Sequence, residues 1–74
     1  MKSNVHIGIE IRKWLNEQNL SVKWLAEEID YDNSNLGKLL NKPYIHSKLL
    51  YSISVALGKD FFALYSKALF EEMK

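Results

Sequence analysis

The stretch from Ser21 to Lys42, SVKWLAEEIDYDNSNLGKLLNK, decides how this chain folds. Its apolar residues recur three and four positions apart on both sides of the polar segment Asp30–Asp32, which is the spacing of two amphipathic helices. Ser21 and Asp32 precede the two halves, and both residue types are preferred at the N-cap of a helix. The sequence therefore predicts a short helix over residues 22–29, a tight turn, and a second helix over residues 33–41.

Two helices that cross at so tight a turn make demands on particular positions. A small residue is needed where the two backbones approach, and Ala26 supplies it. The turn needs a residue that tolerates a positive φ, which Asp30 does more readily than most residues. The residues expected at the crossing are apolar: Leu25, Ile29, Leu36 and Leu39. This arrangement is that of a helix-turn-helix, in which the second helix enters the major groove of DNA.

The rest of the chain also has helical periodicity, and strand alternation persists nowhere. Asn19 and Gly58 suit left-handed helix ends, and Asp60 suits the N-cap of a last helix. The other helices are expected over about 4–18, from His46 or Ser47 to Leu57, and over 61–73. We therefore expect residues 1–74 to form one compact all-α domain of five helices.

The composition excludes some kinds of site but does not identify a function. The chain has 74 residues and no cysteine, so disulfides and cysteine-based zinc sites are excluded. Its formal net charge of +1 neither requires nor excludes a nucleic-acid partner. No apolar run approaches the length of a membrane span. We expect a cytoplasmic protein with no membrane partner.

The segment Ser21–Lys42 resembles the helix-turn-helix of the Cro/C1-type (XRE) family of bacterial and phage repressors. The resemblance covers roughly residues 8–58 and includes the pair Leu25-Ala26, the apolar residues of the crossing, Pro43, and the pair Leu57-Gly58. The segment NSNLGKLLN, residues 33–41, is especially similar to the lambda-type repressors. The resemblance implies a lambda-repressor-like five-helix fold and a transcriptional regulator that binds double-stranded DNA, acting as a repressor.

Candidate DNA-binding residues lie on the polar face of the second helix and around its ends. An asparagine can bond bidentately to adenine, and serine or lysine can bond a base edge. The residues expected to contact bases are Asn33, Ser34, Gly37 and Lys38. Those expected to contact phosphates are Ser21, Lys23, Asn41, Lys42 and Tyr44. Each residue alone also fits ordinary surface polarity, but their gathering on one helix-turn-helix favours DNA binding.

Gly37 stands inside the second helix, where glycine costs about 1 kcal/mol relative to alanine. It falls on the polar face, between Asn33 or Ser34 and Asn41. A residue without a side chain there would let the helix backbone approach the groove closely. The alternative is a tolerated surface glycine.

The last helix has more apolar surface than one core needs. One face comprises Phe61, Leu64, Tyr65 and Ala68, and a second face comprises Phe62, Leu69, Phe70 and Met73. We expect the second face to form the interface of a homodimer. The alternative is that it covers an apolar strip of the first helix, Val5 and Ile9.

Other chemistry lacks support in the sequence. His6 and His46 have no partners at metal-ligand spacing, and no catalytic motif is present. We expect no enzyme activity, no cofactor, no metal site and no small-molecule substrate. Trp14 and Trp24 fit a core better than a base-stacking site. The competing function is a protein-interaction module, such as an antirepressor or an antitoxin-type partner, without autonomous DNA binding.

Overall fold

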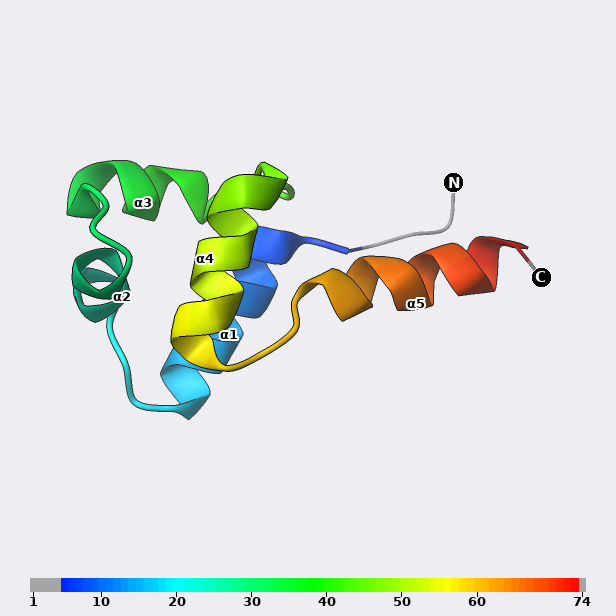
Figure 1. Ribbon diagram of the computed structural model, residues 1–74, viewed down its shortest axis with the longest axis horizontal. Helices are drawn as coiled ribbons and strands as arrows, with labels where there is room; N and C mark the ends of the chain where they lie inside the picture. The colour runs from blue at the N-terminus through cyan, green and yellow to red at the C-terminus, as the bar shows by residue number, and fades with distance from the viewer. Residues whose placement is uncertain (1–4, 74) are drawn as a thin grey trace.

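The computed structural model describes residues 5–73, and in this part of the chain it contains five helices and no strand (Figure 1). The helices are α1 (Ile7–Glu17), α2 (Val22–Glu28), α3 (Asn33–Leu39), α4 (Ser47–Leu57) and α5 (Phe62–Met73). The predicted all-α, five-helix fold is therefore confirmed. None of the helices within residues 5–73 is long and apolar enough to cross a membrane.

The core lies between α1, α2, α3 and α4, and each of these helices contributes one apolar stripe. Its fully enclosed members include Ile7, Ile11, Leu25, Leu36, Leu40, Leu50, Ile53 and Phe61. Ala26, the small residue expected where the two helices cross, is also buried. Trp14 and Trp24 are half-buried and pack against this core, so their expected structural role is confirmed.

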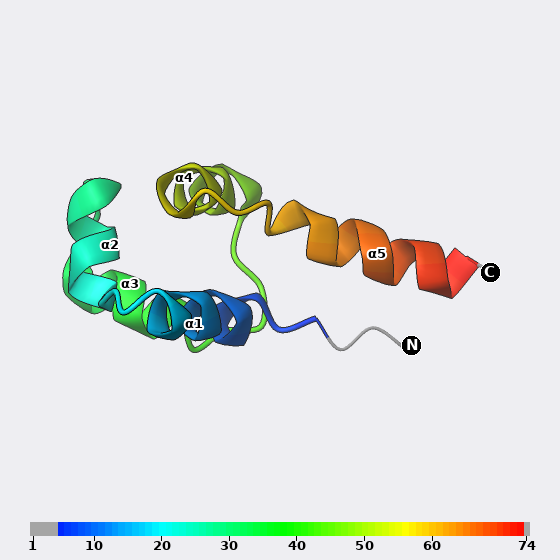
Figure 2. The same ribbon diagram turned by 90° about the horizontal axis from the view of Figure 1, so that it is seen from below.

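Helix α5 projects away from the other four helices and gives the molecule its elongated outline (Figures 1 and 2). The longest extent is 40 Å, against 21 Å in the two other directions. Phe61, directly before α5, is fully buried, whereas no residue of α5 itself is. The chain is thus anchored at Phe61 and leaves the core along α5.

The connection between α4 and α5 is held against α1 by Trp14. Its indole Nε1 donates a hydrogen bond to the carbonyl oxygen of Leu57 at 3.3 Å. The Lys59 ammonium lies 4.7 Å from the centroid of the Trp14 ring and 5.9 Å from that of Phe61. Such cation–π contacts contribute roughly 0.5–1 kcal/mol at exposed sites. These contacts fix the point from which α5 projects.

The turns form where the sequence predicted left-handed residues. Asn19 has φ 58°, Asp30 has φ 55° and Gly58 has φ 64°. Asp60 caps α5, because its Oδ1 accepts from the N–H of Ala63 at 3.2 Å. The expected N-cap roles of Ser21 and Asp32 are confirmed as well, by bonds from Trp24 N–H at 3.0 Å and Asn35 N–H at 2.8 Å.

Several predicted helix boundaries were wrong by one or two residues within residues 5–73. Helix α1 begins at Ile7 because His6 is extended and caps it; the predicted start near residue 4 lies outside the described residues. Helix α2 ends one residue early, at Glu28, and α5 starts one residue late, at Phe62. Helix α3 ends at Leu39, two residues early, because the N–H groups of Asn41 and Lys42 turn back to the carbonyls of Lys38 and Leu39.

Candidate nucleic-acid interface

The α2–α3 pair presents the candidate interface, and its connection is only four residues long, Ile29–Asp32. Within it, the left-handed Asp30 reverses the chain, and the N–H of Tyr31 donates to the carbonyl oxygen of Ala26 at 2.8 Å. That bond uses one of the α2 carbonyls that have no partner within the helix. The turn is therefore closed by its own backbone, which sets the direction in which α3 leaves α2.

Helix α3 is strongly two-sided. Leu36 and Leu40 are buried, and the half-buried Leu39 packs against the same core. Asn33, Ser34 and Lys38 are exposed. Because the three leucines face the core, the side chains of Asn33, Ser34 and Lys38 face solvent. These three predicted base-contacting residues are therefore accessible to a ligand.

Gly37 lies on the polar side of α3, as expected. A Cβ atom built on this residue would have no atom within 4 Å apart from its own helix and chain neighbours. The protein itself therefore has room for a side chain at residue 37. Its packing gives no reason for glycine at this position.

The residues predicted to contact phosphates lie in two places, at the start of α2 and in the segment after α3. Ser21 and Lys23 are exposed at the start of α2. The segment after α3 carries Asn41, Lys42 and Tyr44, which are exposed too, with 70% of Tyr44 accessible. The structure brings the first group to the α2 N-terminus and the second to the segment that follows α3.

Two backbone hydrogen bonds hold the segment after α3 against the start of α1. The N–H of Ile7 donates to the carbonyl oxygen of Pro43 at 2.8 Å, and the N–H of Gly8 donates to that of Lys42 at 3.2 Å. These two N–H groups belong to the first turn of α1, which has no partner for them within the helix. The segment thus turns two carbonyls toward α1.

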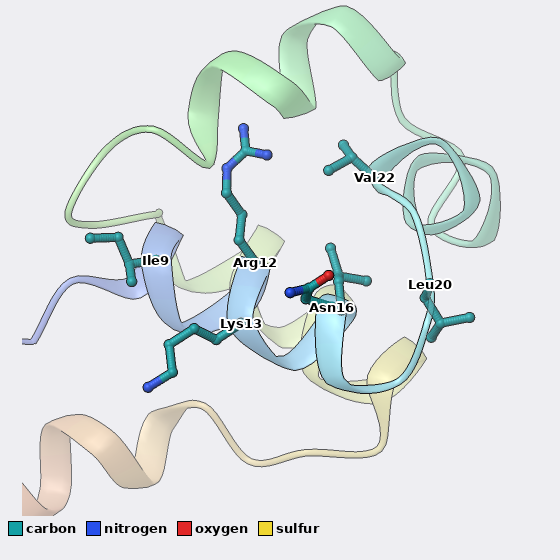
Figure 3. A pocket seen from close by; sticks show the side chains of 7 residues that line it. Ile9, Arg12, Lys13, Asn16, Leu20 and Val22 are labelled. Carbon is teal, nitrogen blue, oxygen red and sulfur yellow. The ribbon is translucent and has the colours of Figure 1, made fainter.

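A residue that sequence analysis missed joins α1 to α3. The exposed Arg12 donates through Nη2 to the carbonyl oxygen of Gly37 at 2.9 Å and to Oδ1 of Asn41 at 3.2 Å. Figure 3 shows the Arg12 side chain leaving α1 and extending toward α3. Its partners lie 25 and 29 residues away in sequence, so no local pattern marks it. The one sequence signal that could have identified Arg12 is its position next to Ile11, a residue of the α1 apolar stripe.

A shallow hollow lies beside Arg12, between α1 and the start of α2 (Figure 3). Its lining mixes two cations and an amide with apolar side chains: Ile9, Arg12, Lys13, Leu15, Asn16, Leu20 and Val22. The hollow belongs to α1 and the start of α2, and its lining includes no residue of α3. In Figure 3, the Lys13 side chain extends from α1 on the side opposite to that of Arg12.

Most of the second face of α5 is exposed to solvent in the described part of the chain. Leu69, Phe70 and Met73 are 57%, 60% and 68% exposed, whereas Phe62 is half-buried and packs against the core. Ile9 remains 50% exposed, so this face does not cover the Val5/Ile9 strip. It is the other face of α5 that approaches Val5, across a hollow lined by Leu64 and Ala68.

Both histidines have a structural role that sequence analysis did not assign. His6 caps α1 and His46 caps α4, each accepting a backbone N–H through Nδ1: Ile9 at 3.1 Å and Leu49 at 3.2 Å. An imidazole nitrogen accepts in this way only when it carries no proton. His46 therefore helps to fix the start of α4.

No family model, no curated protein and no solved structure matches this chain. The likeness to the Cro/C1-type family therefore rests on the residues and helices of this chain alone.

Proposed function

We propose that this chain is a sequence-specific transcriptional regulator of the Cro/C1-type helix-turn-helix class, which binds double-stranded DNA and acts as a repressor. The observation that carries the proposal is the two-sided character of α3. Its leucines hold one side in the core, while Asn33, Ser34 and Lys38 extend into solvent from the other. The B-DNA major groove admits an α-helix, and side chains of these types bond base edges.

Phosphate contacts would flank α3 and set its register in the groove. Lys23 and Ser21 at the start of α2, and Asn41, Lys42 and Tyr44 after α3, are suited to this role. Phosphate contacts position a protein without specifying sequence. The two backbone bonds from α1 support this assignment, because they limit the movement of the segment that holds Lys42 and Tyr44.

The functional unit would be a homodimer on two DNA half-sites. The exposed Leu69 and Met73, together with Phe62, lie along one line of α5, at spacings of seven and four residues. Phe70 borders this line. Burial of apolar side chains gains about 1.5–3 kcal/mol per residue, which favours a partner on this face. A second copy supplies the same face by two-fold symmetry.

Salt dependence of duplex binding tests the proposal. A dimer that neutralises four phosphates with Lys23 and Lys42 should lose roughly a hundredfold in affinity between about 50 and 200 mM salt. Lys42→Ala should weaken binding to every sequence and flatten this dependence. Lys67→Ala removes a charge from α5, away from the candidate interface, and serves as the control. A wild-type protein that binds no duplex even at low salt would refute the proposal.

The protein-interaction module remains a second candidate because apolar side chains are exposed on α4 as well as on α5. Tyr51 and Val55 of α4 are each 65% exposed. An antirepressor or antitoxin-type partner would use such surfaces and need no DNA. The two candidates separate in the same assay, since this one predicts no salt-dependent affinity for duplex.

A further inference from the structure

The C-terminus of α3 leaves one backbone carbonyl that its own helix does not use. In a longer helix, the carbonyl oxygen of Gly37 would accept from the N–H of Asn41. Here the N–H of Asn41 donates to the carbonyl of Lys38 at 3.1 Å instead. Arg12 donates to the carbonyl oxygen of Gly37 instead, with Nη2 at 2.9 Å. A cation is thus bound where the carbonyls of α3 concentrate negative partial charge.

The same nitrogen of Arg12 fixes the side chain of Asn41. Nη2 lies 3.2 Å from Oδ1 of Asn41, and its two hydrogens can serve both acceptors. Because a guanidinium has donors only, the amide oxygen of Asn41 must face it, and the amide nitrogen must point elsewhere. That nitrogen carries two donors, which suit a phosphate oxygen and cannot pair with another donor.

We propose that Arg12 is a positioning residue for DNA binding: it fixes the end of α3 at Gly37 and orients Asn41 so that the amide NH₂ group donates to a phosphate. This inference rests on the proposed DNA-binding function and names a residue of α1 that determines how α3 is presented. Asn41 makes the contact, and Arg12 acts through it.

The planar guanidinium explains why arginine suits this position. Its fork of donors can hold two acceptors at once in a fixed geometry, whereas a lysine ammonium is a point charge on a flexible stem. Arg12→Lys therefore keeps the charge and loses the fixed geometry. Lys13→Ala is the matched control for charge, because Lys13 is the next residue of α1 and is also exposed.

The experiment measures affinity for a selected duplex and for a random duplex with wild-type protein and these variants. Arg12→Ala should lose roughly tenfold on the selected duplex, as expected for hydrogen bonds to a charged group. It should lose less on the random duplex, where the Asn41 phosphate contact is lost but a misplaced α3 has no base-specific contacts to lose. Lys13→Ala should lower both affinities by the same small factor, roughly threefold or less. Arg12→Lys should lower the ratio of the affinity for the selected duplex to that for the random duplex about as much as Arg12→Ala does.

A double-mutant cycle with Asn41→Ala tests the route through Asn41. In the Asn41→Ala background, the further change Arg12→Ala should cost roughly threefold or less, because the side chain that it orients is already gone. Full additivity of the two losses would overturn the proposal. The fold of each variant is checked by urea unfolding, and Arg12→Lys retains the test if Arg12→Ala is unstable.

The side-chain amide of Asn41 provides a readout without DNA. Its NH₂ resonances in the NMR spectrum of the free protein should shift in Arg12→Ala and stay in place in Lys13→Ala. If the wild-type protein binds no duplex, the proposed function fails and the DNA-binding role of Arg12 fails with it. If the wild-type protein binds and Arg12→Ala behaves as Lys13→Ala does in both assays, the inference about Arg12 fails alone.

Discussion

Gly8 of α1 lies directly against the backbone of Leu40. A Cβ atom at residue 8 would overlap the carbonyl oxygen of Leu40 and lie 2.6 Å from that of Lys42. Both neighbours are backbone atoms, which cannot move aside as the end of a side chain can. The absence of a side chain at residue 8 is therefore what lets the start of α1 bond to the segment after α3.

Gly8→Ala should destabilise the protein, because the new methyl group forces α1 away from residues 40–42. Overpacking of this kind costs about 1–3 kcal/mol. Urea unfolding followed by tryptophan fluorescence measures the change. An unchanged or higher unfolding midpoint would show that α1 and this segment are not held in the described contact.

Gly37→Ala is the matched comparison, since the same change is made in open space. Stability should rise by up to about 1 kcal/mol, the helix propensity that alanine restores. If α3 enters the major groove with its backbone close to the DNA, affinity for duplex should nevertheless fall. A rise in stability with unchanged affinity would mark Gly37 as a tolerated surface glycine.

His46→Ala should destabilise α4, because the N–H of Leu49 loses its acceptor. Loss of an N-cap side chain costs about 1 kcal/mol. His46→Asn replaces the imidazole nitrogen with an amide oxygen and should recover most of the loss. Equal unfolding midpoints for His46→Ala and the wild type would contradict the capping role.

Leu69→Ala should weaken the proposed homodimer. Leu69 lies between Phe62 and Met73 on this face of α5, and its truncation in both copies removes about 1.5–3 kcal/mol of burial from each side. Sedimentation at micromolar concentration should show a wild-type dimer that dissociates in the variant, while Lys67→Ala stays dimeric. A wild-type protein that is strictly monomeric would refute the dimer proposal.

Local signals in the sequence predicted most of the helical framework. The left-handed turns at Asn19, Asp30 and Gly58 form because glycine, asparagine and aspartate tolerate positive φ. The cap bonds of Ser21 and Asp32 form because a short side-chain oxygen reaches a backbone N–H three residues on. Each of these features depends on neighbours along the chain, so one sequence was enough to predict it.

The missed features depend on residues far apart in sequence. Arg12 finds acceptors on α3, and Gly8 matters only because residues 40–42 lie against it. The importance of Gly37 was inferred from helix propensity, while packing constrains Gly8 far more. The direction of α5 was equally inaccessible, since its second apolar face was compatible both with a dimer interface and with covering α1.

Selection of bound sequences from a pool of random duplexes tests the central claim most directly. A dimer that inserts α3 into successive major grooves should enrich a palindromic site with half-sites about 10 base pairs apart. The same selection with Asn33→Ala should relax the preference at one position of each half-site. Recovery of a pool that remains random, from a protein shown to be folded, would contradict sequence-specific DNA binding.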